Sequence, residues 1–304
     1  MRLPSIALVA FSLVVVRPAS GDVCLFTITD LGTMMGGTSS YGYSINDSGH
    51  VAGYFVASDK RTQAFLYDGT TMHDLGSAVE GTGSEEFGIN NADYVTGEAY
   101  FPSGGRHAFL YDGTTMNDLG ILGGNDSKGC GVNDAGQVTG SSRNASNYLR
   151  AFLYSSGVMT DLGTLGGDHS SAHDINNAGH VTGLAGLSSG DRHAFLFDGT
   201  NMIDLGSLGG TFPGYGTYAI GYGINDADQV VGKSWRADLE TVAFLHDGTT
   251  MHDLGTLVGG APWGGFGGLC YQQCRPRGRD LWGQQRQTAC VSLRWHDKGS
   301  QRSN

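Results

Sequence analysis

An internal repeat is the feature that most constrains this chain. One string, A-F-L-Y-D-G-T-T-M-H-D-L-G in its first full copy, begins at Ala64, Ala108, Ala151, Ala194 and Ala243. A second string, I-N-D-S-G-H-V-A-G in its first copy, begins at Ile45, Ile89, Val132, Ile175 and Ile224. The aspartate of D-L-G falls at Asp30, Asp74, Asp118, Asp161, Asp204 and Asp253, so the spacings are 44, 44, 43, 43 and 49 residues. Self-similarity at such a period is typical of repeated supersecondary units.

Each copy predicts four short strands joined by tight turns. Asp-Gly between alternating apolar runs is a strong hairpin signal. In the second string, Gly49, Gly136 and Gly179 stand where the turn needs a positive φ, and Asp93 and Asp228 replace glycine with a residue that tolerates it. The 51 glycines and only 15% charged residues also indicate many turns and disfavour a helical fold.

A four-stranded unit of this length is the size of a propeller blade. The sequence predicts an all-β, propeller-like array of five repeats, at about 38–76, 84–120, 125–163, 168–206 and 217–255, within the range 38–260. The range 22–37 matches only a fourth strand, and such a half-unit suits a ring whose chain ends complete one blade. A β-solenoid is the alternative architecture, but its coils are usually shorter.

The first residues predict export. Arg2 is followed by an apolar run from about Ile6 to Val16 and then by small residues, which makes 1–21 a signal peptide. The apolar run is too short to span a bilayer. We therefore expect a secreted, extracellular protein without a membrane span.

The charge balance disfavours nucleic acid as a partner. Residues 21–268 carry 27 Asp and Glu against 9 Lys and Arg, whereas residues 269–304 carry 7 basic and 2 acidic side chains. An acidic body is repelled by phosphate backbones.

The repeat strings resemble the HAF family of extracellular repeat proteins. The family is named for the H-A-F seen at His107–Phe109 and His193–Phe195, and the resemblance covers roughly Thr38 to Gly260. It implies a secreted bacterial protein and brings no catalytic residue or ligand. Arg150 and Val242 depart from the pattern by replacing the leading histidine, and S-S-G replaces D-G-T in the third full copy.

The range 261–304 breaks the pattern and predicts a frameshifted sixth repeat. The string L-C-Y-Q-Q-C-R-P-R-G-R from Leu269 can be encoded by codons that, shifted by one nucleotide, read Y-A-I-N-N-A-G-H-V-V. Such a tail, out of frame from a breakpoint in 262–268, is expected to be disordered. Cys270, Cys274, Cys290 and His296 lack the paired spacing of a structural zinc site.

Most candidate polar residues recur once per repeat, which favours a structural role over a catalytic one. The repeated D-L-G aspartates are expected to accept backbone N–H groups, and the asparagine of the second string to form an Asx-turn. The repeated histidines are His50, His73, His107, His180, His193 and His252, and the repeated asparagines are Asn46, Asn90, Asn133, Asn176 and Asn225. Calcium at the N-D-S-G turn is an alternative, although the alternating ligand set of a calcium loop is missing.

One slot in the first strand is mostly aromatic, and the acids outside the repeats lie in expected loops or at strand ends. The slot predicts either core packing or an aromatic ring along a central channel; Cys130 there is a buried thiol or a disulfide partner of Cys24. The slot holds Tyr43, Phe87, Cys130, His173 and Tyr222, and the acids are Asp59, Glu80, Glu85, Glu86, Glu98, Asp191, Asp238 and Glu240.

These observations support a secreted, non-enzymatic repeat protein that binds a surface glycan or protein and needs no cofactor. No catalytic or metal site is predicted, and the ligand-binding residues stay unknown. The alternative is an exported glycan hydrolase or lyase that uses the acids outside the repeats, which would have to converge in one pocket. A third hypothesis is that this chain is a non-functional relic because its sixth repeat is out of frame.

Overall fold

The computed structural model describes residues 30–34, 36–75, 88–101, 105–212 and 216–256. The predicted signal peptide, most of the half-unit 22–37 and the tail 261–304 lie outside the described residues. Contacts divide the chain into Met1–Gly32 and Thr33–Asn304, and the repeats belong to the second unit. None of the described residues forms a helix that could cross a membrane.

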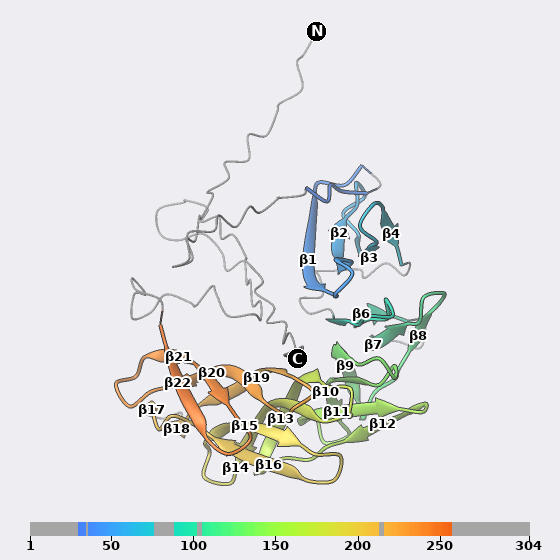
Figure 1. Ribbon diagram of the computed structural model, residues 1–304. Helices are drawn as coiled ribbons and strands as arrows, with labels where there is room; N and C mark the ends of the chain where they lie inside the picture. The colour runs from blue at the N-terminus through green and yellow to red at the C-terminus, as the bar shows by residue number, and fades with distance from the viewer. Residues whose placement is uncertain (1–29, 35, 76–87, 102–104, 213–215, 257–304) are drawn as a thin grey trace, which may run out of the picture. The chain divides into compact units, whose positions relative to one another are not determined.

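The predicted all-β repeat architecture is confirmed in the described residues, which form five successive four-stranded antiparallel repeats (Figure 1). Repeat 1 is β1 Ser39–Ile45, β2 Val51–Val56, β3 Thr62–Tyr67 and β4 Met72–Asp74. Repeat 2 is β5 Gly88–Ile89, β6 Val95–Tyr100, β7 Arg106–Tyr111 and β8 Met116–Asp118. Repeat 3 is β9 Gly123–Val132, β10 Val138–Asn144, β11 Leu149–Ser155 and β12 Val158–Asp161. Repeat 4 is β13 Gly166–Ile175, β14 Val181–Leu187, β15 Arg192–Phe197 and β16 Met202–Gly206. Repeat 5 is β19 Ala219–Ile224, β20 Val230–Trp235, β21 Thr241–His246 and β22 Met251–Gly255.

Strand pairing is that of propeller blades and not of a solenoid. In each repeat the strands pair in chain order, as a meander. Among the described residues, the pairs outside the meanders are single ones, such as the parallel pair of Arg106 with Asp126. The last spacing is longer because a small hairpin, β17 Thr211–Phe212 and β18 Gly216–Thr217, precedes repeat 5.

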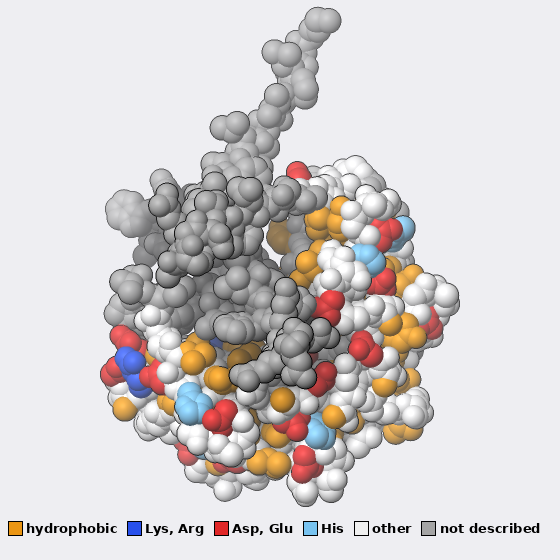
Figure 2. Space-filling model, viewed as in Figure 1, with side chains coloured by type: hydrophobic (Ala, Val, Ile, Leu, Met, Phe, Trp, Pro, Cys, Tyr) orange, Lys and Arg blue, Asp and Glu red, His pale blue; other side chains and the backbone are white. Residues whose placement is uncertain are grey.

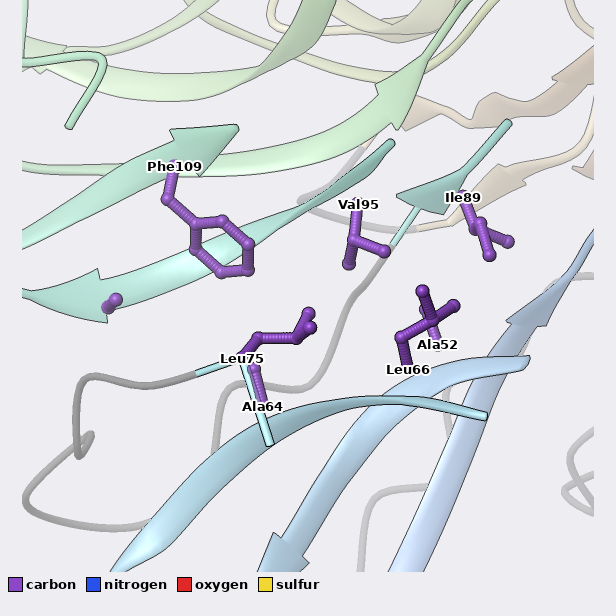
Figure 3. Close-up of a cluster of buried hydrophobic side chains, with 8 residues drawn as sticks. Ala52, Ala64, Leu66, Leu75, Ile89, Val95 and Phe109 are labelled. Carbon is purple, nitrogen blue, oxygen red and sulfur yellow. The ribbon is translucent and has the colours of Figure 1, made fainter. Parts of the chain in front are cut away.

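The hydrophobic core lies between consecutive repeats. In the cluster of Figure 3, Ala64 and Leu75 from repeat 1 pack with Ile89, Val95 and Phe109 from repeat 2. Equivalent residues form the clusters between repeats 2 and 3, 3 and 4, and 4 and 5. We call the side that each repeat turns to the next its trailing face, marked by the alanine of A-F-L and the D-L-G leucine. The opposite side, marked by the Ile or Val that starts the second string, is its leading face.

The phenylalanine of A-F-L is fully buried in all five repeats. Phe65, Phe109, Phe152, Phe195 and Phe244 are each 0% exposed. Burying such a side chain stabilises a protein by about 1.5–3 kcal/mol relative to leaving it exposed. The A-F-L string therefore recurs because each repeat places the same side chain in the core.

A β-bulge in the first strand explains the invariant glycine of the second. The register shifts at Tyr43, Cys130, His173 and Tyr222, which are the slot residues of repeats 1, 3, 4 and 5. A bulge inserts one residue and bends its strand. Opposite it, a Cβ on Gly140 would overlap the carbonyl oxygen of Lys128, and the same holds at Gly53, Gly183 and Gly232 for their own first strands. Only glycine fits there.

Replacing Gly140 with alanine should lower the free energy of unfolding by about 1–3 kcal/mol, because the backbone oxygen of Lys128 cannot move aside without disturbing β9. Gly223→Ala is the matched control, since its new Cβ would meet a side-chain methyl of Val231 at 3.2 Å. Urea unfolding of the two variants measures the difference. Equal losses would contradict this account of the glycine.

Candidate functional site

The histidine before A-F-L bonds to the D-L-G aspartate of its own repeat. His107 Nδ1 lies 2.9 Å from Asp118 Oδ1, and His193 Nδ1 lies 2.8 Å from Asp204 Oδ1. These bonds tie the third strand to the fourth. Where the histidine is replaced, another donor reaches the aspartate. These donors are Gln63, Arg150 and, in the repeat that has Val242, Arg236, which follows β20.

Two further sets of histidines also pair with carboxylates. His50 and His180 contact an aspartate of the next repeat, with Nδ1 2.7 Å from Asp93 Oδ1 and 2.8 Å from Asp228 Oδ1. These aspartates have φ of 63° and 60°, as predicted for the turn. His73 and His252 bond within their own hairpins, to the aspartate of D-G-T. All six repeated histidines therefore have carboxylate partners.

The D-L-G aspartates accept backbone N–H groups, as predicted. The Oδ1 atoms of Asp118, Asp161, Asp204 and Asp253 each accept from the N–H of the glycine two residues on, at 2.7–2.8 Å. Each carboxylate therefore accepts hydrogen bonds from two sides: from the glycine N–H of this turn, and from the histidine or the donor that replaces it. Such a residue closes the repeat rather than acting on a ligand.

The repeated asparagines form the predicted Asx-turns. Asn133 Oδ1 accepts the N–H groups of Ala135 and Gln137 at 3.1 and 3.0 Å, and the other four copies do the same at their own turns. These bonds occupy the oxygen that the calcium hypothesis needs. Among the described residues, no group of three or more His, Cys, Asp or Glu side chains is arranged to hold a metal.

Sequence reasoning missed the second role of the asparagine, which is to join repeats. The Nδ2 groups of Asn46, Asn90, Asn133 and Asn176 donate to the backbone oxygen of the equivalent asparagine in the next repeat, at 2.8–3.1 Å. We call this series the asparagine ladder. The signal was present, because an amide side chain can accept at its own turn and donate to a neighbour, whereas a carboxylate can only accept.

The first-strand slot is buried where the described residues show it. Cys130, His173 and Tyr222 are 1%, 6% and 8% exposed, and the rings of His173 and Tyr222 make an edge contact at 5.4 Å. Tyr43 packs partly buried against the first core cluster. Phe87 and Cys24 lie outside the described residues, so the aromatic ring and the disulfide stay predictions.

The acids outside the repeats are held by local partners in different repeats. Asp59 bonds to Arg61, Glu98 to Arg106, and Asp191 to Ser189 and Thr217. Asp238 and Glu240 share the guanidinium of Arg236. Glu80, Glu85 and Glu86 lie outside the described residues. Acidic side chains are spread over the visible face of the described part (Figure 2).

The pKa values of three of these acids are lowered, whereas the pKa of a catalytic acid is raised. The hydrogen bond from Arg61 lowers the pKa of Asp59, and bonds from Arg236 lower that of Asp238. The Ser189 hydroxyl and the Thr217 N–H lower the pKa of Asp191 to about 2. A glycosidase acid needs a raised pKa so that it carries a proton at neutral pH. These three groups are carboxylates there.

An open cavity of about 460 Å³ lies where β13 begins and the β14–β15 loop passes, an arrangement the sequence did not reveal. Its polar lining includes Asp168 and Ser188. Arg150 Nη1 donates to the backbone oxygen of Asp168 at 2.7 Å, and the guanidinium of Arg150 lies over the ring of Tyr148, which is 47% exposed. The hydrogen bond from His169 lowers the pKa of Asp168, so its exposed carboxylate is an acceptor. The glycine-rich lining is the feature that a search for non-repeated residues could have found.

Comparisons give structural likenesses only. No family model and no curated protein matches the sequence. TolB from Acinetobacter baumannii is 14% identical with a TM-score of 0.48, over 72% of this chain and 54% of that chain, so the chain spans about half of TolB. The β-propeller domain of the trilobed protease from Pyrococcus furiosus is 10% identical, over 71% of each chain, with a TM-score of 0.49. A six-bladed β-propeller lectin from Aleuria aurantia is 13% identical over 72% of this chain and 79% of that chain, with a TM-score of 0.40.

Asn133→Asp should separate the two roles of the asparagine. The carboxylate keeps both Asx-turn bonds but loses the donor to Asn176, and it sets a charge against that carbonyl. We expect a loss of about 1–3 kcal/mol in the free energy of unfolding. Asn225→Asp is the control, because within the described part of the chain Asn225 Nδ2 bonds only to its own Gln229, and this variant should lose much less. Equal losses in the two variants would argue against the ladder.

The lowered pKa of Asp191 predicts a pH-dependent contribution to stability. Because the folded-state pKa of about 2 lies below the ordinary value of 3.8, the contribution is full above pH 4 and is lost as the pH falls from 4 toward 2. The melting temperature of the wild type should therefore fall more steeply in this window than that of Asp191→Asn. Parallel melting curves would contradict the assignment.

Proposed function

We propose that this chain is an exported, non-enzymatic repeat protein of the HAF type that binds an extracellular glycan. The signal pattern in 1–21 supports export, and the repeat strings support the family. The β-propeller scaffold supplies rigid strands that hold loops in place, which suits binding through loop side chains. The ligand is proposed to bind at the end of the sheets where the second strand of each repeat turns into the third.

The cavity beside Asp168 is the observation that carries the proposed ligand class. It offers a hydroxyl at Ser188 and a carboxylate acceptor at Asp168, and Arg150, which bonds to the backbone of Asp168, links it to the exposed Tyr148. Binding sites commonly combine an apolar surface with a few polar groups that fix orientation. Hydroxyl and carboxylate partners in an open, glycine-lined cavity suit a sugar, which carries many hydroxyl groups.

The state of the carboxylates supports binding without hydrolysis. Asp59, Asp191 and Asp238 have lowered pKa values and local partners, so each is suited to accept hydrogen bonds and not to donate a proton to a leaving group. Asp168 has the same direction of pKa shift.

Glycan-array screening followed by titration calorimetry tests the proposal. Tyr148→Ala and Asp168→Asn should each weaken binding of the selected glycan at least tenfold, about 1.4 kcal/mol. Val158→Ala is the control, because Val158 is 61% exposed in the β11–β12 hairpin, at the opposite end of the same repeat, and should leave affinity unchanged. Absence of glycan binding would overturn the proposal, and release of reducing sugar would favour the hydrolase alternative.

A further inference from the structure

The trailing face of repeat 5 is the exposed counterpart of a surface that is covered in the other repeats. The D-L-G leucine is 8% and 6% exposed at Leu75 and Leu119 and partly buried at Leu162 and Leu205, but it is 51% exposed at Leu254. In the second strand, the residue after the first valine is fully buried in repeats 1 to 4, as at Thr139. The same position in repeat 5 is Val231, which is 37% exposed. Repeat 5 therefore exposes apolar side chains at positions that the earlier repeats cover.

The asparagine ladder stops at the same face. In repeats 1 to 4 the asparagine donates to the following repeat, whereas Asn225 Nδ2 donates only to its own Gln229, at 2.9 Å. The backbone N–H after the asparagine likewise bonds to the next repeat in the earlier copies, as from Asn177 N to Asp226 Oδ1 at 2.9 Å. Among the described residues, the N–H of Asp226 has no such acceptor. The face thus presents apolar side chains and unused donors together.

The leading face of repeat 1 is more exposed than the leading faces of repeats 2 to 4. Ile89, Val132 and Ile175, which pack against a preceding repeat, are 5–8% exposed, but Ile45 is 37% exposed. The first valine of the second strand is 0% exposed in repeats 2 to 5, whereas Val51 is only partly buried. The side that would contact a preceding repeat is therefore open in repeat 1.

We propose that the trailing face of repeat 5 binds the leading face of repeat 1 in a second copy of this chain. The four interfaces between consecutive repeats are the template for this contact, since each joins one trailing face to one leading face by the same apolar cluster. Residues 257–304 contain neither repeat string, so they do not supply a matching leading face, and we assign that role to repeat 1 of another copy. A contact between two different surfaces is heterologous and can continue from copy to copy.

Sedimentation of the purified full chain tests this contact. The mean mass of the wild type should rise with concentration, because each bound copy leaves one face of each kind open. Leu254→Asp and Ile45→Asp should each remain monomeric, since a carboxylate at either face would be buried against apolar side chains. Both residues are exposed, and unchanged circular dichroism would show that the variants fold.

Mixing the two variants makes the test specific. Ile45→Asp keeps its trailing face and Leu254→Asp keeps its leading face, so the mixture should form a one-to-one dimer and stop there. Ile203→Asp is the control: Ile203 is 41% exposed, its equivalents are exposed in every repeat, and the variant should associate like the wild type. A wild type that stays monomeric at all concentrations, as it would if the faces joined within one chain, would overturn the proposal. So would a mixture that does not dimerise.

Discussion

The burial of apolar side chains between repeats, and not within them, is the constraint on which the rest of this structure depends. A four-stranded sheet has two faces and cannot cover either by itself. Each of the four main clusters draws side chains from two consecutive repeats. Stability is then a sum of repeat terms and neighbour terms. This explains why A-F-L and D-L-G recur with so little change, because every copy must fit the copy on either side.

The close packing of the sheets fixes the backbone as well as the side chains. The first-strand bulge carries the slot residue and brings a carbonyl oxygen over the second strand, where glycine follows the valine and threonine of V-T-G. Thr139, next to this glycine, is fully buried and donates its hydroxyl to the backbone oxygen of Phe152 at 2.7 Å. In this string, valine therefore packs in the core, threonine donates a hydrogen bond to a buried carbonyl oxygen, and glycine leaves room for the carbonyl oxygen of the first strand.

The sequence predicted the repeats, their strands, the hairpin turns and the Asx-turns because these follow from short-range rules. Asp-Gly and Asn-x-x-Gly determine a turn from neighbouring residues alone. The bulge and the cavity were not predicted, because each depends on how two strands or loops meet. Cys130 is an example. The repeat pattern identified its position in the first strand, but the bulge at this position is seen only when the pairing with the second strand is known.

The residue after the ladder asparagine shows how neighbouring copies are distinguished. It alternates in chain order as Asp47, Asn91, Asp134, Asn177 and Asp226. The amides of the two asparagines donate back to the aspartates of the preceding repeats, at 2.8 Å for Asn91 to Asp47 and 3.1 Å for Asn177 to Asp134. Five aspartates in this row would set like charges beside one another, and five asparagines would lose the charge-assisted bond. At the other two interfaces the backbone N–H of the asparagine donates to the aspartate that follows, so the alternation supplies a charged acceptor at every interface and keeps two aspartates from facing each other.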